Sequence, residues 1–123
     1  MILIVEDDAQ VARLISLVLQ RNGYTSEIVN DGSVALDHIR SNPPQLVFAD
    51  LKVKGLAGDA LCAALHNDPT TSGVPVVVVS GDRDIAEKAR RCGAKDHLGK
   101  PFEFDDLIRL VKKHVEHENH PTD

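Results

Sequence analysis

Short, continuous runs of aliphatic residues alternate with amphipathic stretches along this chain. The runs at residues 2–5, 46–49 and 76–79 contain only apolar residues, which is typical of strands that are buried on both faces of a parallel sheet. Two other runs, at residues 25–29 and around 97–98, mix apolar and polar positions. The pattern therefore predicts five strands, of which the three apolar ones lie in the centre of a sheet and the two mixed ones at its edges.

Amphipathic segments predict one helix after each of these strands. In the first segment, which Gly23 ends, the apolar residues recur at the spacing of one helix face: Val11, Leu14, Ile15, Val18 and Leu19. Further helices are expected at residues 33–40, around 61–65, at 82–91 and at 103–118. The last of these would bury Leu107, Ile108, Val111 and Val115.

Five strands that alternate with five helices predict an α/β fold with three layers, in which a doubly wound parallel sheet is covered on both faces. With the apolar strands in the centre, the strand order becomes 2-1-3-4-5, which is flavodoxin-like. Sheets of this type bind ligands at the carboxyl ends of the first and third strands. In this chain Glu6 and Asp7 follow the first of these strands, and Asp50 follows the other.

The length of 123 residues fits one domain, which we place at residues 1–118, with a flexible tail at 119–123. A net charge of −5 and the absence of Trp disfavour a nucleic-acid surface, so we expect no direct DNA binding. The chain shows neither a membrane-spanning run nor a signal peptide, which favours a cytoplasmic protein without membrane contact. Cys62 and Cys92 lack the spacing of a metal site and are interpreted as buried thiols.

Three carboxylates that converge on one crevice repel each other unless a cation neutralises them. Mg²⁺ suits Glu6, Asp7 and Asp50 because it is a hard cation that takes oxygen ligands, and Mn²⁺ is a substitute with similar preferences. Together with Lys100, at the end of the fifth strand, one divalent ion would balance the three negative charges. The sequence therefore predicts a magnesium site that can also admit a phosphoryl group.

The other strand ends supply groups that would contact such a phosphoryl group. Ser80 ends the fourth strand and its hydroxyl can donate to a phosphoryl oxygen, while Gly81 leaves space beside it. Lys100 offers a positive charge, and Pro101 can fix the direction of its loop, for example through a cis bond. A carboxylate can attack phosphorus to give an acyl phosphate. We therefore predict that Asp50 is the phosphoryl acceptor.

With these motifs, the whole chain resembles the receiver domain of bacterial two-component response regulators, of the chemotaxis-regulator type. The matching stretches are ILIVEDD at 2–8, LVFAD at 46–50 with Gly58 downstream, VVVVS at 76–80 and GAKDHLGKPF at 93–102. The resemblance implies that Asp50 takes a phosphoryl group from a sensor histidine kinase or a histidine phosphotransfer protein. It also implies Mg²⁺ ligands at Glu6, Asp7, Asp50 and the backbone carbonyl of Lys52.

The resemblance further implies how the signal would leave the site. Ser80 and Lys100 would contact the phosphoryl group and pass the change to the face formed by the fourth helix, the fifth strand and the fifth helix. That face would control a downstream effector protein or domain, or form a homodimer. The chain would thus be a phosphorylation-dependent switch that catalyses its own phosphorylation and slow dephosphorylation, and not a metabolic enzyme.

The sequence departs from the family pattern in the loop after Asp50 and in the fifth strand. The loop reads Leu-Lys-Val-Lys at residues 51–54, where an apolar residue and a proline are usual, and Ala57 stands where an Asp is common. His97 occupies the position of the usual aromatic switch residue, where its ring can still pack but is titratable near neutral pH. The loop geometry and the coupling through the fifth strand are therefore the parts that the resemblance does not define.

Charged residues near the expected site suggest two further features. Lys52 follows the acceptor by two residues and Asp82 follows Ser80 by two, and the two side chains carry opposite charges. We expect them to form an ion pair across the mouth of the site and to slow loss of the phosphoryl group. The helix at residues 82–91 is crowded with charges, which form either a solvated face or a partner surface, and the sequence leaves both interpretations open.

Other classes of function fit the residues less well. A phosphatase of the haloacid dehalogenase type would carry a second Asp two residues after the nucleophile, where this chain has Lys52. In a flavodoxin-like cofactor module, Glu6, Asp7 and Asp8 would repel a phosphate, and Asp8 is interpreted as the helix N-cap. A degenerate receiver that acts only as a protein-interaction module stays open. Three histidines spaced by three residues are more typical of a solvated tail than of a metal site: His114, His117 and His120.

Overall fold

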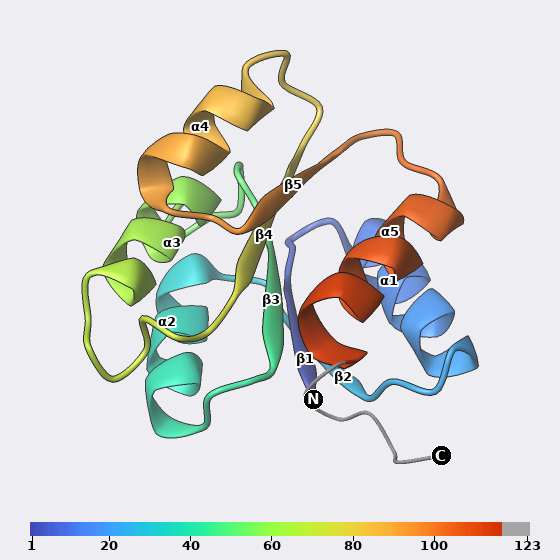
Figure 1. Cartoon of the computed structure of the whole chain (residues 1–123), viewed down its shortest axis with the longest axis horizontal. Coiled ribbons are helices and arrows are strands. Elements are labelled where there is room, and N and C mark those ends of the chain that lie inside the picture. The colour runs from blue at the N-terminus through green and yellow to red at the C-terminus, as the bar shows by residue number, and fades with distance from the viewer. Residues whose placement is uncertain (117–123) are drawn as a thin grey trace.

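The computed structural model describes residues 1–116, in which five strands alternate with helices (Figure 1). The strands are β1 (Ile2–Val5), β2 (Ser26–Val29), β3 (Leu46–Asp50), β4 (Val76–Ser80) and β5 (Asp96–Gly99). The helices are α1 (Ala9–Arg21), α2 (Gly32–Ser41), α3 (Gly58–His66), α4 (Ile85–Cys92) and α5 (Phe104–Val111), and α5 continues into a π-helical segment, Lys112–Glu116. The tail predicted at 119–123 and the helix end predicted at 118 lie outside the described residues.

All neighbouring strands run parallel, in the order β2-β1-β3-β4-β5. Figure 1 shows α1 and α5 on one side of the sheet and α2, α3 and α4 on the other. The predicted α/β class, the three layers and the strand order are therefore confirmed. The register aligns the ends of the central strands, because Val5 lies opposite Ala49 and Asp50 lies opposite Val79. Side chains that end or follow these strands consequently emerge at one edge of the sheet.

An apolar layer on each side of the sheet holds the helices in place. On the side of α1 and α5, the strand residues Ile4, Phe48 and Val77 belong to the same packed cluster as Ile15 and Leu107, and each is at most 1% exposed. The alternate residues of the same strands pack on the side of α2, α3 and α4. Burial of both faces explains why the central strands consist almost entirely of apolar residues.

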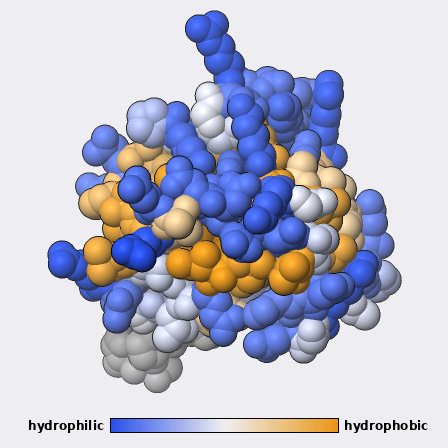
Figure 2. All heavy atoms as spheres, turned by 180° about the vertical axis from the view of Figure 1, so that it is seen from behind, coloured by the Kyte–Doolittle hydropathy of each residue, from blue (hydrophilic) through white to orange (hydrophobic). Residues whose placement is uncertain are grey.

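The buried face of α1 differs from the sequence-based prediction. Leu14 was expected on the buried face but is 41% exposed, and its neighbour Leu17 is 45% exposed. The buried stripe instead includes Ala12 and runs along Ile15 and Leu19, because only that side of α1 faces the sheet. Leu14 and Leu17 lie at the margin toward α5. Seen from behind, the hydrophilic surface of the molecule is interrupted by apolar patches (Figure 2).

α4 is shorter than predicted, and the last helix changes its geometry along its length. α4 begins at Ile85 and not at residue 82; the Asp82 amide donates to the Ser80 hydroxyl, and residues 83–84 form a turn before the helix. The regular part of α5 ends at Val111, and the π-helical segment begins at Lys112. Ile108 was expected to be buried but is only partly so, since it faces the margin toward α1. The other apolar residues of this segment are buried as predicted: Leu107, Val111 and Val115.

Two smaller predictions are confirmed. Asp8 is the N-cap of α1, because its Oδ1 accepts the amides of Gln10 and Val11 at 3.0 and 3.3 Å. Cys62 and Cys92 are buried free thiols, and burial raises the pKa of Cys62 far above its ordinary value. Within residues 1–116, no helix combines the length and the apolar character that are needed to cross a membrane.

Candidate functional site

The carboxyl end of β1 leads into three consecutive acids. Glu6 is 3% exposed, whereas Asp7 and Asp8 are exposed. The Glu6 amide donates to the Val29 carbonyl of β2 at 3.0 Å, which continues the pairing of β1 by one residue. Glu6 Oε2 in turn accepts the Asp8 amide at 3.1 Å. The sheet therefore fixes the backbone of Glu6, and the turn into α1 orients its carboxylate.

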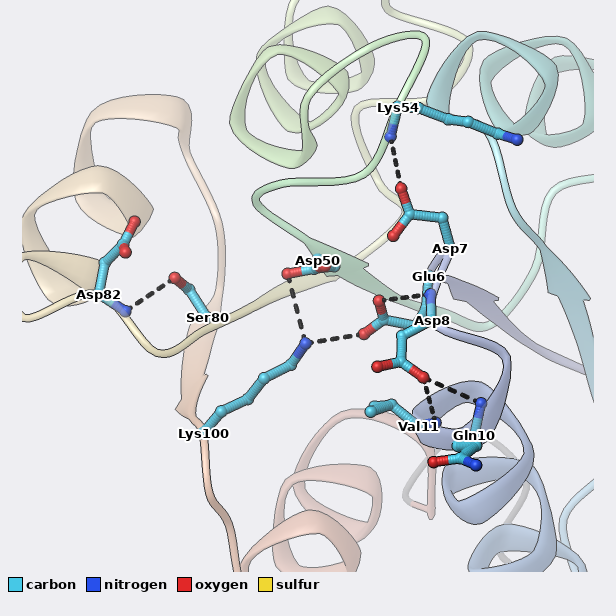
Figure 3. A network of polar contacts seen from close by, with 10 residues as sticks. All are labelled: Glu6, Asp7, Asp8, Gln10, Val11, Asp50, Lys54, Ser80, Asp82 and Lys100. Atoms are coloured by element: carbon cyan, nitrogen blue, oxygen red, sulfur yellow. Dashed lines mark hydrogen bonds and ion pairs between the residues drawn. The ribbon is translucent and has the colours of Figure 1, made fainter.

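Asp50 ends β3 and Lys100 follows β5, and the sheet brings their side chains together. Asp50 is 7% exposed, and Lys100 Nζ lies 3.6 Å from Asp50 Oδ1 and 2.9 Å from Glu6 Oε1. Figure 3 shows the Lys100 side chain reaching both carboxylates. The peptide bond between Lys100 and Pro101 is cis. Residues at the ends of three strands thus form one cluster of opposite charges.

Burial and ion pairing act in opposite directions on these groups. Burial raises the pKa of Glu6 above its ordinary value, although hydrogen bonds from Lys100 and from the Asp8 amide partly offset this effect. Burial also opposes the charge on Lys100, but the hydrogen bond to Glu6 and the charge of Asp50 outweigh it, so that the pKa of Lys100 is raised. Lys100 consequently stays protonated at neutral pH and compensates part of the buried negative charge.

The acids also present the donor set of a cation site. Glu6, Asp7 and Asp50 each place one carboxylate oxygen within 4.8 Å of the others. A hard divalent cation fits such a set, because it prefers oxygen ligands, whereas a soft ion prefers thiolates. Lys100 brings one positive charge to three carboxylates, so negative charge remains for a cation to neutralise. Lys52, whose carbonyl is the fourth predicted ligand, lies exposed in the turn that follows β3.

Ser80 ends β4, next to the strand that carries Asp50, and is 2% exposed. Its Oγ accepts the Asp82 amide at 2.9 Å, which leaves the hydroxyl proton available for another acceptor. In Figure 3, Ser80 lies on the opposite side of Asp50 from Glu6. A Cβ on the adjacent Gly81 would meet its nearest neighbour, an atom of Lys100, at 3.7 Å, so the space beside Ser80 does not itself require glycine.

An ion-pair network joins the loop after β3 to Asp82, two residues after Ser80, and to α4. Lys52 Nζ is 3.3 Å from Asp82 Oδ1, and Lys88 Nζ of α4 is 3.2 Å from Asp82 Oδ2. Hydrogen bonds from Lys88 and Lys52 lower the pKa of Asp82 below its ordinary value. The predicted contact between Lys52 and Asp82 is therefore present, but the participation of Lys88 was not predicted. The spacing of four residues between Asp84 and Lys88 predicts an ion pair between these two residues, and their Oδ1 and Nζ atoms are 3.7 Å apart. That spacing does not predict the contact of Lys88 with Asp82.

His97 lies outside the acidic cluster. It is an exposed residue of β5, opposite Val78 of β4, and it borders a hollow of about 460 Å³ between β5 and α5. Because side chains alternate along a strand, His97 shares its face of the sheet with Val78 and Ser80. His97 thus lies beside β4, opposite a residue that precedes Ser80 by two positions.

Two further contacts of the site involve the backbone. The Lys54 amide donates to Asp7 Oδ2 at 3.2 Å, while Figure 3 shows the Lys54 side chain pointing away from the acids. Every residue except proline has such an amide, so the residue type could not predict this contact. A Cβ on Gly58 would lie 2.4 Å from the Asp50 carbonyl oxygen, which explains why the sequence has glycine at that position.

Comparison with known proteins relates this chain to one family. The family model described as the response regulator receiver domain matches residues 2–112. The DNA-binding response regulator MtrA of Mycolicibacterium paratuberculosis is 34% identical over 113 residues, which cover 90% of this chain and 49% of that protein. The chain thus spans about half the length of the curated relatives that it matches.

Solved structures give the same result for the fold. The receiver domain of NtrX from Brucella abortus matches with a TM-score of 0.85 and 32% identity, over 94% of this chain and 98% of that domain. The signal receiver domain of a signal transduction histidine kinase from Syntrophus aciditrophicus matches with a TM-score of 0.88 and 28% identity, over 99% of this chain and 94% of that one. This chain is therefore similar to receiver domains in both sequence and fold.

Proposed function

This chain belongs to the response regulator receiver domain family of two-component signalling, and on that premise we propose that Asp50 accepts a phosphoryl group in a Mg²⁺-dependent reaction. The donor is a phosphohistidine on a sensor histidine kinase or a histidine phosphotransfer protein. The phosphorylated form is the signalling state of the chain, and it lasts until the acyl phosphate is hydrolysed.

The observation that carries this proposal is the position of Lys100 between Glu6 and Asp50. A lysine that is held 2.9 and 3.6 Å from two buried carboxylates provides fixed positive charge beside the proposed acceptor. A phosphoryl group brings further negative charge into this place, so it could not approach three uncompensated acids. Ser80 adds a hydroxyl proton from the neighbouring strand end.

Glu6, Asp7, Asp50 and the backbone carbonyl of Lys52 would hold the Mg²⁺ ion. When it is bound, the ion supplies positive charge that stabilises the oxygens of the transferring phosphoryl group. Asp7 is the exposed carboxylate of this set and would meet the ion as it enters from solvent. The two buried members, Glu6 and Asp50, provide fixed oxygens because Lys100 holds both in place.

In the proposed step, an Asp50 carboxylate oxygen attacks phosphorus and the phosphorus–nitrogen bond of the phosphohistidine breaks. The electron pair of that bond leaves with the imidazole ring, and an acyl phosphate remains on Asp50. Lys100 donates to a phosphoryl oxygen, and Ser80 donates its hydroxyl proton to another. Later attack by water releases inorganic phosphate and regenerates the carboxylate.

The signal would leave through the face formed by α4, β5 and α5. Phosphorylation replaces the single negative charge of the carboxylate with about 1.5 to 2 negative charges and brings three acceptor oxygens, which is enough to shift the equilibrium between two arrangements of Ser80 and its loop. His97 lies on the same sheet face and would carry the change to β5. A downstream effector protein or domain, or a second copy of the chain, would recognise the altered face in the cytoplasm.

The test is phosphorylation by a small donor in the absence of any kinase. The protein, with Mg²⁺ and acetyl phosphate, should gain one phosphoryl group by intact mass, whereas Asp50→Asn should gain none. Asp37→Asn, which removes an exposed acid of α2, serves as the matched control and should behave as the wild type. Chelation of the divalent ion should abolish the adduct. An equal adduct on Asp50→Asn would overturn the proposal.

A further inference from the structure

We propose that the turn between β2 and α2 positions the metal ligand Asp7 through the loop that follows β3. The contact, here called the loop clamp, consists of Asp31 and Gly32 on the side of the turn and of Lys54, Gly55 and Leu56 on the side of the loop. The inference rests on the proposed function, because it concerns the Mg²⁺ ligands of the same site. The clamp residues themselves bind neither the ion nor the phosphoryl group.

Both backbone groups of Lys54 are engaged, one on each side of the loop. Its carbonyl accepts the Gly32 amide at 2.8 Å, and its amide donates to Asp7 Oδ2 at 3.2 Å. The first amide of α2 thus holds the loop, and the loop holds the Asp7 carboxylate. A displacement of Lys54 away from Gly32 would move the donor that orients Asp7.

The two sides of the clamp fit without spare room. A Cβ on Gly32 would lie 1.8 Å from the Leu56 carbonyl oxygen, and a Cβ on Gly55 would lie 2.1 Å from Asp31 Oδ1. Gly55 also has a φ of +83°, which side-chain-bearing residues rarely adopt. Asp31 cannot easily retreat, because its Oδ1 caps α2 by accepting the amides of Ser33 and Val34. The loop is therefore seated against a fixed helix end.

Asp7 depends on such support more than the other predicted ligands do. Glu6 and Asp50 are buried and contact Lys100, whereas Asp7 is exposed, and in the described structure its hydrogen-bond donor is the Lys54 amide. Partners that orient a metal ligand typically change metal affinity by about 10- to 100-fold when they are lost. The loop at residues 51–57 contains no proline that would restrict its own backbone, so its shape depends on contacts from outside.

The test compares Mg²⁺ affinity, measured by isothermal titration calorimetry, between two clamp variants and two matched controls. Gly55→Ala is matched by Gly23→Ala, because Gly23 has a φ of +88° but no neighbour within 4 Å of an added Cβ. Gly32→Ala is matched by Gly73→Ala, where an added Cβ also meets nothing within 4 Å. We expect Kd for Mg²⁺ to rise about tenfold in both clamp variants and to stay unchanged in both controls.

Two further measurements separate this role from a general loss of fold. Thermal unfolding shows which variants are folded, and the two clamp variants are independent, so either one decides the question if the other does not fold. Amide hydrogen exchange of the metal-free protein should show faster exchange at Lys54 in the clamp variants than in the controls. Lys54→Ala keeps the backbone amide and should not weaken Mg²⁺ binding, because its side chain points away from Asp7 (Figure 3).

The possible failures are distinguishable. If the wild type binds Mg²⁺ and the clamp variants bind it as tightly as the controls, the clamp is overturned and the proposed function stands. If Kd rises equally in the clamp variants and in their controls, the effect comes from backbone strain or chain stiffness, and the clamp is likewise overturned. If the wild type binds no Mg²⁺, both the clamp and the metal requirement of the proposed function are overturned.

Discussion

Lys100 compensates two buried acids at once, and the electrostatics of the site depend on it more directly than on any other side chain described above. Glu6 and Asp50 are 3% and 7% exposed, and both carboxylates lie within 3.6 Å of Lys100 Nζ. Removal of one partner from a buried ion pair leaves a charge without compensation, which is strongly unfavourable. The same cation therefore stabilises the protein without metal, and in the proposed function it would also attract the phosphoryl group.

Lys100→Met should lower the free energy of unfolding by about 1–3 kcal/mol, less than for a fully buried pair because Lys100 is 28% exposed. Urea unfolding without divalent cations measures this loss. Added Mg²⁺ should recover part of it, since the ion supplies positive charge to the same acids. Lys95→Met, at an exposed lysine before β5, is the control. A variant at Lys100 that is as stable as this control would contradict the account of the cluster.

Lys52→Ala should shorten the lifetime of the phosphoryl group on Asp50. Lys52 pairs with Asp82, and these residues follow Asp50 and Ser80 by two positions each, so we expect loss of the pair to open the approach of water to the acyl phosphate. The expected change is about two- to fivefold, because an exposed ion pair contributes little energy. Loss of the adduct over time, followed by intact mass, measures the lifetime, with Lys95→Ala as the control. An unchanged or longer lifetime would show that the pair has no such role.

At the scale of elements, the polarity of each strand predicted its place in the sheet. β1, β3 and β4 are fully buried and central, whereas β2 and β5 have mixed exposure and form the edges. The helices were predicted less well, because an apolar residue can lie at the margin between two elements. Leu14 and Ile108 fit the helical period, yet both face the junction of α1 and α5 and not the centre of the core.

The attachment of α5 to β5 is a second feature that the helical period could not predict. Asp96, at the start of β5, accepts hydrogen bonds from Lys113 and His114 at 2.9 Å each, in the segment that continues α5. Burial opposes the charge of Asp96, but these two partners outweigh it and lower its pKa below the ordinary value. Asp96 therefore holds the end of the helix whose beginning follows Lys100.

Asp96→Asn should lower the free energy of unfolding at pH 7 by up to about 1 kcal/mol, a value that allows for solvent screening. Because the pKa of Asp96 is lower in the folded protein, its contribution is fully present above the unfolded-state pKa, near 3.8. The contribution is lost as the pH falls through the lower folded-state pKa. Urea unfolding at several pH values should thus show that the difference in the free energy of unfolding between wild type and variant disappears in acid. Asp37→Asn should be as stable as the wild type at every pH. A stability difference for Asp96→Asn that persists in strong acid would contradict the role assigned to the Asp96 charge.

At the scale of the whole molecule, the sheet explains why residues from distant parts of the chain could be predicted to meet. Glu6, Asp50, Ser80 and Lys100 each end or follow a strand, and parallel strands in a known order place such residues at one edge. The backbone contacts of the site could not be predicted in this way. The Lys54 amide and the close fit of Gly32 depend on the path of a loop, which residue types do not specify.

The central claim is that the strand ends make Asp50, and no neighbouring nucleophile, the phosphoryl acceptor. The most direct test is to treat the protein with Mg²⁺ and acetyl phosphate, reduce it with borohydride, and map its peptides by mass spectrometry. Reduction converts an aspartyl phosphate to homoserine, so the account predicts homoserine at position 50 and an unmodified Asp7. A modification at Asp7, Ser80 or His97 with an unchanged Asp50 would contradict it.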